Sequence, residues 1–203
     1  MIRVRVALAV AMLALLAGCH GREARLPTRA NFTAAVADYL AQRGRLCLAK
    51  YDWPIVVPDA DARADDADAR QMRLLESLGL VAATDAPAGR RYALTAAGQK
   101  YYVRVPVVVA TATQRVTHPA DFCVGRLSLD RVFGWEPPQR LGGRTVSSVL
   151  FSYRVDPAPW MRTPDARRAF PLAVRAIDNA GTLQLRLGVH LTRDGWVADE
   201  LSS

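Results

Sequence analysis

Residues that commonly carry catalytic or metal chemistry are scarce in this chain, which has three histidines, three cysteines and two lysines among 203 residues. No pair of the histidines (His20, His118 and His190) has metal-ligand spacing. No Gly-x-Ser-x-Gly, His-Glu-x-x-His or phosphate-cradling glycine loop occurs either. The sequence therefore predicts no metal site, no cofactor and no catalytic residue. A cysteine nucleophile, Cys47 or Cys123, paired with His118 or His190 remains an alternative.

Long hydrophobic runs are also absent after the first twenty residues, and there are no repeats or low-complexity segments. The exception is the N-terminus, where two basic residues precede the uncharged apolar run 6–17. This run is too short for a stable membrane span and is typical of a secretory signal. It ends in Leu16-Ala17-Gly18-Cys19, which resembles the lipobox of a bacterial lipoprotein.

The lipoprotein resemblance covers about the first twenty residues and implies three changes at Cys19: its sulfur takes a diacylglycerol, the chain is cut before it, and the new amine is acylated. We therefore expect residues 1–18 to be a signal peptide, residues 19–30 to be a tether, and the membrane to be reached through the Cys19 lipid. His20 stands where many enteric lipoproteins retained in the inner membrane have Asp, so we expect the periplasmic face of the outer membrane. The alternative is an ordinary signal peptide with a chance cysteine.

Charge restricts the partners only weakly. Cleavage before Cys19 leaves 185 residues with 25 basic and 19 acidic side chains, a net charge of +6, which suits an anionic envelope partner or an envelope protein. No block of Arg or Lys exceeds two residues, and the excess of Arg over Lys resembles the codon bias of a GC-rich genome. A dedicated basic patch is accordingly the less favoured interpretation.

Two cysteines remain once Cys19 is assigned to lipid, namely Cys47 and Cys123. In an oxidising compartment they are expected to form a disulfide that joins the two parts of the mature chain. Two buried free thiols too far apart to join are the alternative.

The first part of the mature chain, residues 31–103, has a helical pattern followed by a hairpin pattern. Apolar spacing predicts helices over 32–43 and 66–78, the second ended by Gly79. The chain continues with Leu78-Gly79-Leu80, then a turn at Pro87 and Gly89, and then Tyr92-Ala-Leu-Thr-Ala-Ala-Gly98. Together they resemble the last helix and β-hairpin wing of a winged-helix domain.

Winged-helix domains often bind DNA. The resemblance implies that four arginines would contact the DNA phosphates, namely Arg70, Arg73, Arg90 and Arg91. Export removes that partner, so a protein-contact role is expected and nucleic-acid binding is not.

The second part, residues 104–203, has strand patterns. Alternation predicts strands over 103–109, 122–135, 146–155 and 183–191, with Pro106 marking an edge or a bulge in the first. A helix over 163–179 must bend or divide at Pro171. The expected class is α+β: a winged-helix-like helical part followed by an antiparallel sheet with this one helix packed on it.

Two further groups favour structural roles. Asp59 and Asp61 begin like a calcium-binding EF-hand loop, but Arg63, Ala64 and Arg70 break the motif, so a solvated helix start is expected. The four tryptophans are expected to close the ends of small cores. The alternative is that some of them are exposed binding anchors. They are Trp53, Trp135, Trp160 and Trp196.

The sequence as a whole predicts a lipid-anchored cell-envelope protein that binds or supports rather than catalyses. Two alternatives stay open. One is an envelope enzyme with an unrecognised site, and the other is a winged-helix DNA-binding protein whose N-terminus only imitates a signal.

Overall fold

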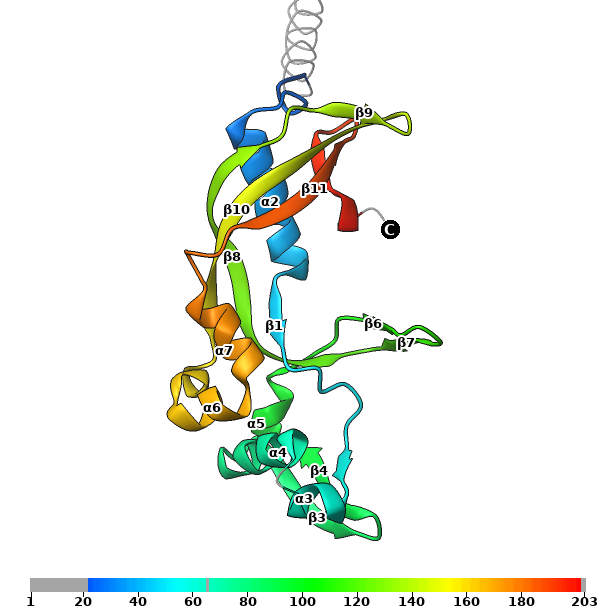
Figure 1. The fold of residues 1–203 in the computed structure, drawn as a ribbon, viewed down its shortest axis with the longest axis vertical. Helices are drawn as coiled ribbons and strands as arrows, with labels where there is room; N and C mark the ends of the chain where they lie inside the picture. Colours follow the sequence, from blue (N-terminus) through cyan, green and yellow to red (C-terminus); the bar gives the residue numbers. More distant parts are fainter. Residues whose placement is uncertain (1–21, 65, 202–203) are drawn as a thin grey trace, which may run out of the picture. The chain divides into compact units, whose positions relative to one another are not determined.

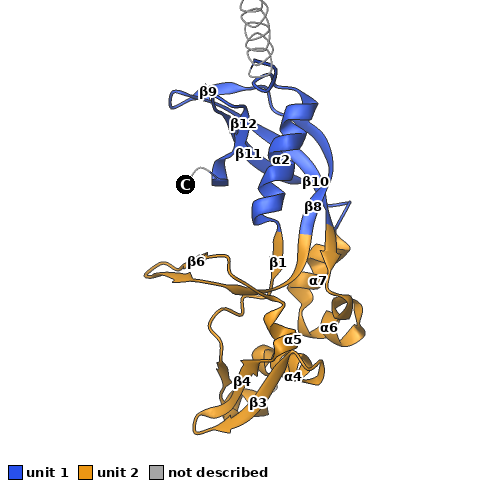
Figure 2. Ribbon diagram, turned by 180° about the vertical axis from the view of Figure 1, so that it is seen from behind, with its two compact units in different colours: residues 1–44, 127–154, 180–203 blue, residues 45–126, 155–179 orange. Residues whose placement is uncertain are grey.

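The structure is a computed structural model that describes residues 22–64 and 66–201; Cys19, His20 and the predicted signal peptide lie outside them. It contains helices and antiparallel sheets, which confirms the α+β class. The chain forms two compact units that alternate along the sequence (Figure 2): unit 1 comprises 1–44, 127–154 and 180–203, and unit 2 comprises 45–126 and 155–179. The boundary expected at 103/104 falls inside unit 2.

The main sheet has the strand order β1-β8-β10-β11-β12; in addition, β5 pairs with β8, and β9 pairs with β10. Figure 1 labels β1, β8, β9, β10 and β11 of this sheet. Its strands are β1 (Arg45–Cys47), β5 (Tyr102–Val103), β8 (Asp121–Trp135), β9 (Gln139–Leu141), β10 (Arg144–Pro157), β11 (Leu185–Leu191) and β12 (Trp196–Ala198). The strands predicted over 122–135, 146–155 and 183–191 are therefore confirmed; the first and third end at the predicted residue and differ only in where they start, and the second is longer at both ends.

Helix α2 (Arg29–Arg43) packs on the sheet of unit 1. Its buried side chains Phe32, Val36 and Leu40 form a core with the inward residues of the strands, among them Val149 and Val189. The helical region predicted over 163–179 also packs on the main sheet, because α6 (Pro164–Ala169) and α7 (Pro171–Asp178) share a core with Phe122 and Val124 of β8; the additional packing of α2 was not predicted. Amphipathic spacing shows that a helix has a buried face, but it does not show which surface that face meets.

The segment before α2 is hydrogen-bonded to unit 1, although it was predicted to be a tether. Thr28 caps the helix by accepting a hydrogen bond from the Asn31 backbone. The Asn31 side chain donates to the carbonyl oxygens of Glu23 (2.7 Å) and Leu26 (2.9 Å). The Leu26 carbonyl also accepts from the Trp196 indole at 3.3 Å.

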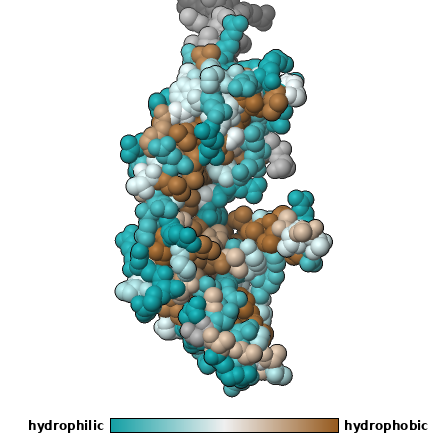
Figure 3. Space-filling model, viewed as in Figure 1, coloured by the Kyte–Doolittle hydropathy of each residue, from teal (hydrophilic) through white to brown (hydrophobic). Residues whose placement is uncertain are grey.

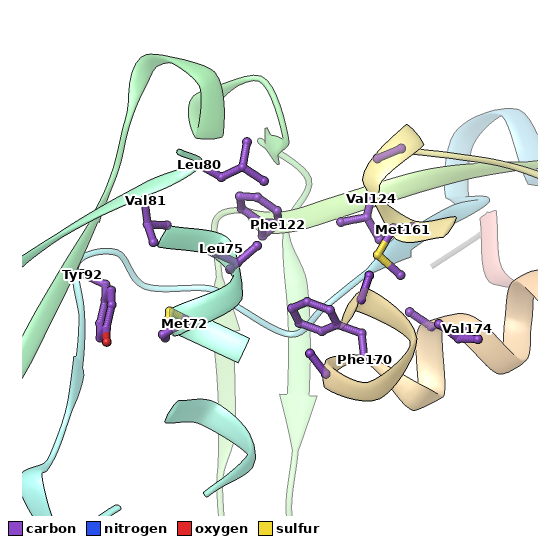
Figure 4. Packing of buried hydrophobic residues seen from close by; sticks show 14 of the residues in the cluster. Met72, Leu75, Leu80, Val81, Tyr92, Phe122, Val124, Met161, Phe170 and Val174 are labelled. Atoms are coloured by element: carbon purple, nitrogen blue, oxygen red, sulfur yellow. The ribbon is translucent and has the colours of Figure 1, made fainter. Parts of the chain in front are cut away.

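Unit 2 contains a three-stranded sheet in the order β2-β4-β3 with helices beside it. This sheet and the helices of the unit comprise β2 (Ile55–Val57), α3 (Asp59–Arg63), α4 (Ala67–Ser77), β3 (Val81–Ala86), β4 (Gly89–Leu94), α5 (Ala96–Gln99), η1 (Pro159–Arg162), α6 (Pro164–Ala169) and α7 (Pro171–Asp178). Met72 and Leu75 of α4 pack toward Phe122 and Phe170 in its core (Figure 4). The predicted helix before Gly79 and the division of the later helix at Pro171 are confirmed.

The single strand predicted over 103–109 is wrong, because the chain divides at Pro106. Strand β5 pairs with β8, whereas β6 (Val107–Ala110) pairs only with β7 (Arg115–His118). Val108 and Val116 of this two-stranded ribbon are exposed, and hydrophobic surface appears there (Figure 3). The last element is η2 (Asp199–Leu201). Among the residues described, no helix combines the length and hydrophobicity needed to cross a membrane.

Candidate ligand-binding pocket

A pocket of about 340 Å³ lies in unit 2, between α4, the junction of α6 and α7, and the residues that follow β1. Its walls are built from 47–49, from Ala67, Arg70 and Gln71 on one side of α4, and from 168–173. Most of the lining is apolar, and a few polar groups converge on it. This combination and this size are typical of a site for a small ligand.

The turn between α6 and α7 creates one wall of the pocket. Thr163 caps α6 by accepting a hydrogen bond from the Ala166 backbone at 3.3 Å. Pro171 has no backbone N–H and starts a new helix, so α6 stops at Ala169. The carbonyl oxygen of Ala169, left without an intrahelical partner, accepts a hydrogen bond from Gln71 Nε2 at 3.0 Å. Gln71 thus fixes α4 to the α6–α7 turn.

The same hydrogen bond leaves the other end of the Gln71 amide unused. Gln71 Oε1 is buried and has no hydrogen-bond donor within the described residues. Buried acceptors are normally paired, and leaving one unpaired costs about 1–3 kcal/mol. A ligand hydroxyl or N–H at this position would recover that cost.

Positive charge gathers at one side of the pocket. Arg70 of α4 and Arg168 of α6 line it, and both also line an adjoining hollow of about 270 Å³ together with Arg73 and Asp165. Arg168 forms an ion pair with Asp165. Guanidinium groups in the lining are suited to contact a ligand that carries negative charge.

The disulfide predicted between Cys47 and Cys123 is present, with the two Cα atoms 3.8 Å apart. The cysteines face each other across β1 and β8, and Cys47 borders the pocket. The bridge joins the two predicted parts of the chain, 31–103 and 104–203, and both cysteines lie in the same compact unit, unit 2. With both sulfur atoms in the bridge, neither cysteine is a nucleophile.

A buried carboxylate stabilises the chain beside the pocket. Asp121 Oδ1 accepts hydrogen bonds from the backbone N–H groups of Lys50 (2.8 Å) and Phe122 (2.6 Å). Burial raises the pKa of Asp121, although these hydrogen bonds and the nearby Lys50 charge oppose the rise. The Lys50 ammonium, itself mostly buried, lies 2.5 Å from Asp68 at the start of α4.

The two described histidines each contact an aspartate through Nδ1. His118 lies 2.8 Å from Asp52 and stacks on the Tyr51 ring with centroids 4.2 Å apart. His190 lies 2.8 Å from Asp199, in unit 1. The alternation of β11 puts His190 on the same face of the strand as Arg186, yet His190 is only 5% exposed. Within the described residues, no group of three or more His, Cys, Asp and Glu side chains is arranged to hold a metal ion.

The remaining predicted residues are dispersed. Among the four arginines of the DNA hypothesis, Arg70 and Arg73 line the hollows described above, whereas Arg90 pairs with Glu76 at 2.9 Å. Asp59 and Asp61 start the short helix α3, as expected of a solvated helix start. All four tryptophans belong to the two cores or pack against them, which confirms their structural role.

Sequence reasoning missed the pocket because its walls come from three segments, the first and last of which lie about 120 residues apart along the chain. The one available signal was Pro171, which predicts a break in the helix but not what the break faces.

Comparisons with models of known protein families, with curated proteins and with solved structures find no match.

Proposed function

We propose that this chain is a lipid-anchored cell-envelope protein that binds a small anionic ligand with an apolar body in the pocket between α4 and α6. The observation that carries the ligand is the pairing of a mainly apolar pocket with the unused Gln71 carbonyl and two arginines. Apolar contact provides most of the affinity in such sites, and the few polar groups fix the orientation. The proposed role is binding.

The binding proposal is tested with indole-3-acetate, which has an apolar ring, one N–H donor and one carboxylate. Calorimetric titration of the purified protein is expected to show saturable binding. Replacing Ala67 with Leu fills the pocket mouth and is expected to weaken binding about tenfold or more, equivalent to about 1.4 kcal/mol. The matched control is Ala62→Leu, on the exposed surface of α3. Equal affinity in both variants, or no binding to the parent protein, would contradict the proposal.

The envelope location is supported by the N-terminal signal pattern and the lipobox ending in Cys19. Labelled palmitate is expected to be incorporated into the parent protein and into Cys47→Ser, but not into Cys19→Ser. Cell fractionation is expected to recover the parent protein with membranes, in agreement with an outer-membrane anchor. Absence of label, or recovery of the protein in the cytoplasm, would favour the alternatives.

We also propose that residues 55–94 are a winged-helix-like module used for protein contact. The strand order β2-β4-β3, with α3 and α4 between β2 and β3, supports this resemblance. The first helix of the predicted module, α2, belongs instead to unit 1. Cross-linking of intact envelopes followed by capture of the protein tests for a partner, and salt-sensitive binding to duplex DNA would instead support the nucleic-acid alternative.

A further inference from the structure

Two arginines face each other across strands β1 and β8, on a surface that the proposed function does not use. Arg45 and Arg126 are register partners in this antiparallel pair. Side chains directly opposite each other in an antiparallel pair lie close together on the same face, and like charges in these positions are destabilising. The fold therefore keeps an unfavourable pair.

Among the described residues, no ion pair relieves this repulsion. Within the described part of the chain, neither Arg45 nor Arg126 forms an ion pair. In addition, Arg45 Nε is buried and has no hydrogen-bond acceptor. Unpaired buried donors are rare because each costs the solvation of its N–H. An anion that contacts the two guanidinium groups from outside the chain would reduce the repulsion.

The arginine pair opens into a hollow of about 470 Å³, within unit 2 and separate from the proposed pocket. Tyr101 and Val124 give it apolar walls, and the turn from Asp156 to Pro159 closes one side. An apolar group can therefore lie beside the guanidinium pair. The hollow also contains the exposed carboxylate of Asp156, which repels a ligand with more than one negative charge.

We infer that Arg45 and Arg126 form a second binding site, which takes the carboxylate of a small monoanion whose apolar part lies against Tyr101. Planar guanidinium groups match the two oxygens of a carboxylate, and such charge-assisted hydrogen bonds are stronger than neutral ones. Asp156 makes a singly charged carboxylate a better ligand than a phosphate dianion. This inference does not depend on the pocket between α4 and α6.

The test follows the Nε–H signal of Arg45 by NMR while benzoate is added to the purified protein. The signal is expected to move in a saturable way, and inorganic phosphate is expected to bind more weakly. Arg126→Gln is expected to weaken benzoate binding about tenfold or more. Arg115→Gln, on the exposed strand β7 and outside the hollow, is the matched control and should leave benzoate affinity unchanged.

A second measurement separates a ligand site from a structural role. If the two arginines repel each other in the free protein, Arg126→Gln should raise the urea midpoint of unfolding. Benzoate should also raise the midpoint of the parent protein, and it should raise the midpoint of the variant much less. An arginine that only supports the fold would instead lower the midpoint when replaced. That result, an unmoved Arg45 signal, or tighter binding of phosphate than of benzoate would overturn the assignment.

Discussion

Asp121 illustrates how one buried carboxylate can organise the chain around it. It is 5% exposed, and one of its oxygens accepts from the backbone of Lys50 and of Phe122, so it connects the turn after β1 to the start of β8. The turn includes Ala49 at a φ of 55°, a conformation that non-glycine residues adopt at a cost. The carboxylate thus helps to stabilise an unfavourable backbone at the edge of the pocket.

The raised pKa of Asp121 predicts a particular pH dependence. Since the folded-state pKa lies above the ordinary value of 3.8, the folded protein holds this proton more tightly than the unfolded chain. The stabilisation is therefore complete below the ordinary pKa and is lost as pH rises through the raised one. Asp121→Asn keeps an oxygen acceptor but does not ionise. The free energy of unfolding of the parent minus that of the variant should fall as pH rises, measured in urea from about pH 3 to about pH 7.

Asp130 provides a control of opposite sign. Hydrogen bonds from Arg154 and Ser152 lower its pKa, so its contribution to stability is present above the ordinary pKa and is lost as pH falls through the lowered value. For Asp130→Asn, the free energy of unfolding of the parent minus that of the variant should rise with pH. The same trend in both variants would contradict these assignments.

The burial of His190 shows where residue-scale prediction stops. Alternation along β11 correctly places His190 on the face opposite Val189. It does not reveal that Asp199, from η2, contacts this outer face. Periodicity assigns a residue to a face of a sheet, but a later segment of the chain decides whether that face is solvated.

At the scale of elements, α5 approaches β3 so closely that only glycine fits at Gly98. A Cβ atom there would lie 1.9 Å from the carbonyl oxygen of Leu80. We predict that Gly98→Ala lowers the free energy of unfolding by about 1–3 kcal/mol because the two backbones must separate. Urea unfolding measures this change. Gly134→Ala is the control, since a Cβ atom at Gly134 has no neighbour within 4 Å; equal losses in both variants would contradict the steric explanation.

Elements with a regular pattern could be predicted, and their partners could not. Strands β10 and β11 alternate cleanly, and α4 has both apolar spacing and a terminating glycine. The strand expected over 103–109 failed because valines alternate on both sides of Pro106, although proline cannot donate to a sheet ladder. The position of α2 on the sheet depends on contacts with residues more than a hundred positions later.

At the scale of the whole molecule, the disulfide is expected to stabilise unit 2 in particular. Its cysteines are 76 residues apart, and a loop of that length gives about 4–5 kcal/mol in the loop-entropy model. Replacing both cysteines with serine should lower the urea midpoint by a corresponding amount. Hydrogen exchange should show lost protection first between residues 47 and 123, all of which lie in unit 2.

The reduced parent protein is the control for this variant. Its stability should match that of the double serine variant, because both lack the crosslink. Greater loss of protection in α2 than in α4 would contradict the assignment of the bridge to unit 2.

The candidate pocket could not be predicted at this scale. Its segments 47–49, 67–71 and 168–173 each have an ordinary local explanation as a strand end, a helix face and a helix break. Only the long-range packing of α4 on α6 brings them together, and a single sequence contains no direct record of that contact.

The alternation of the two units along the chain sets an order for their completion during synthesis. The ribosome releases a chain from its N-terminus, so unit 2 has all its residues once residue 179 has emerged. Unit 1 begins first, with α2, but finishes last, because β11 and β12 come after residue 180. Until then the apolar face of α2 lacks Val189 and Trp196, two of its core partners. Deleting β11 and β12 should therefore leave a chain that completes unit 2 and exposes the hydrophobic side of α2.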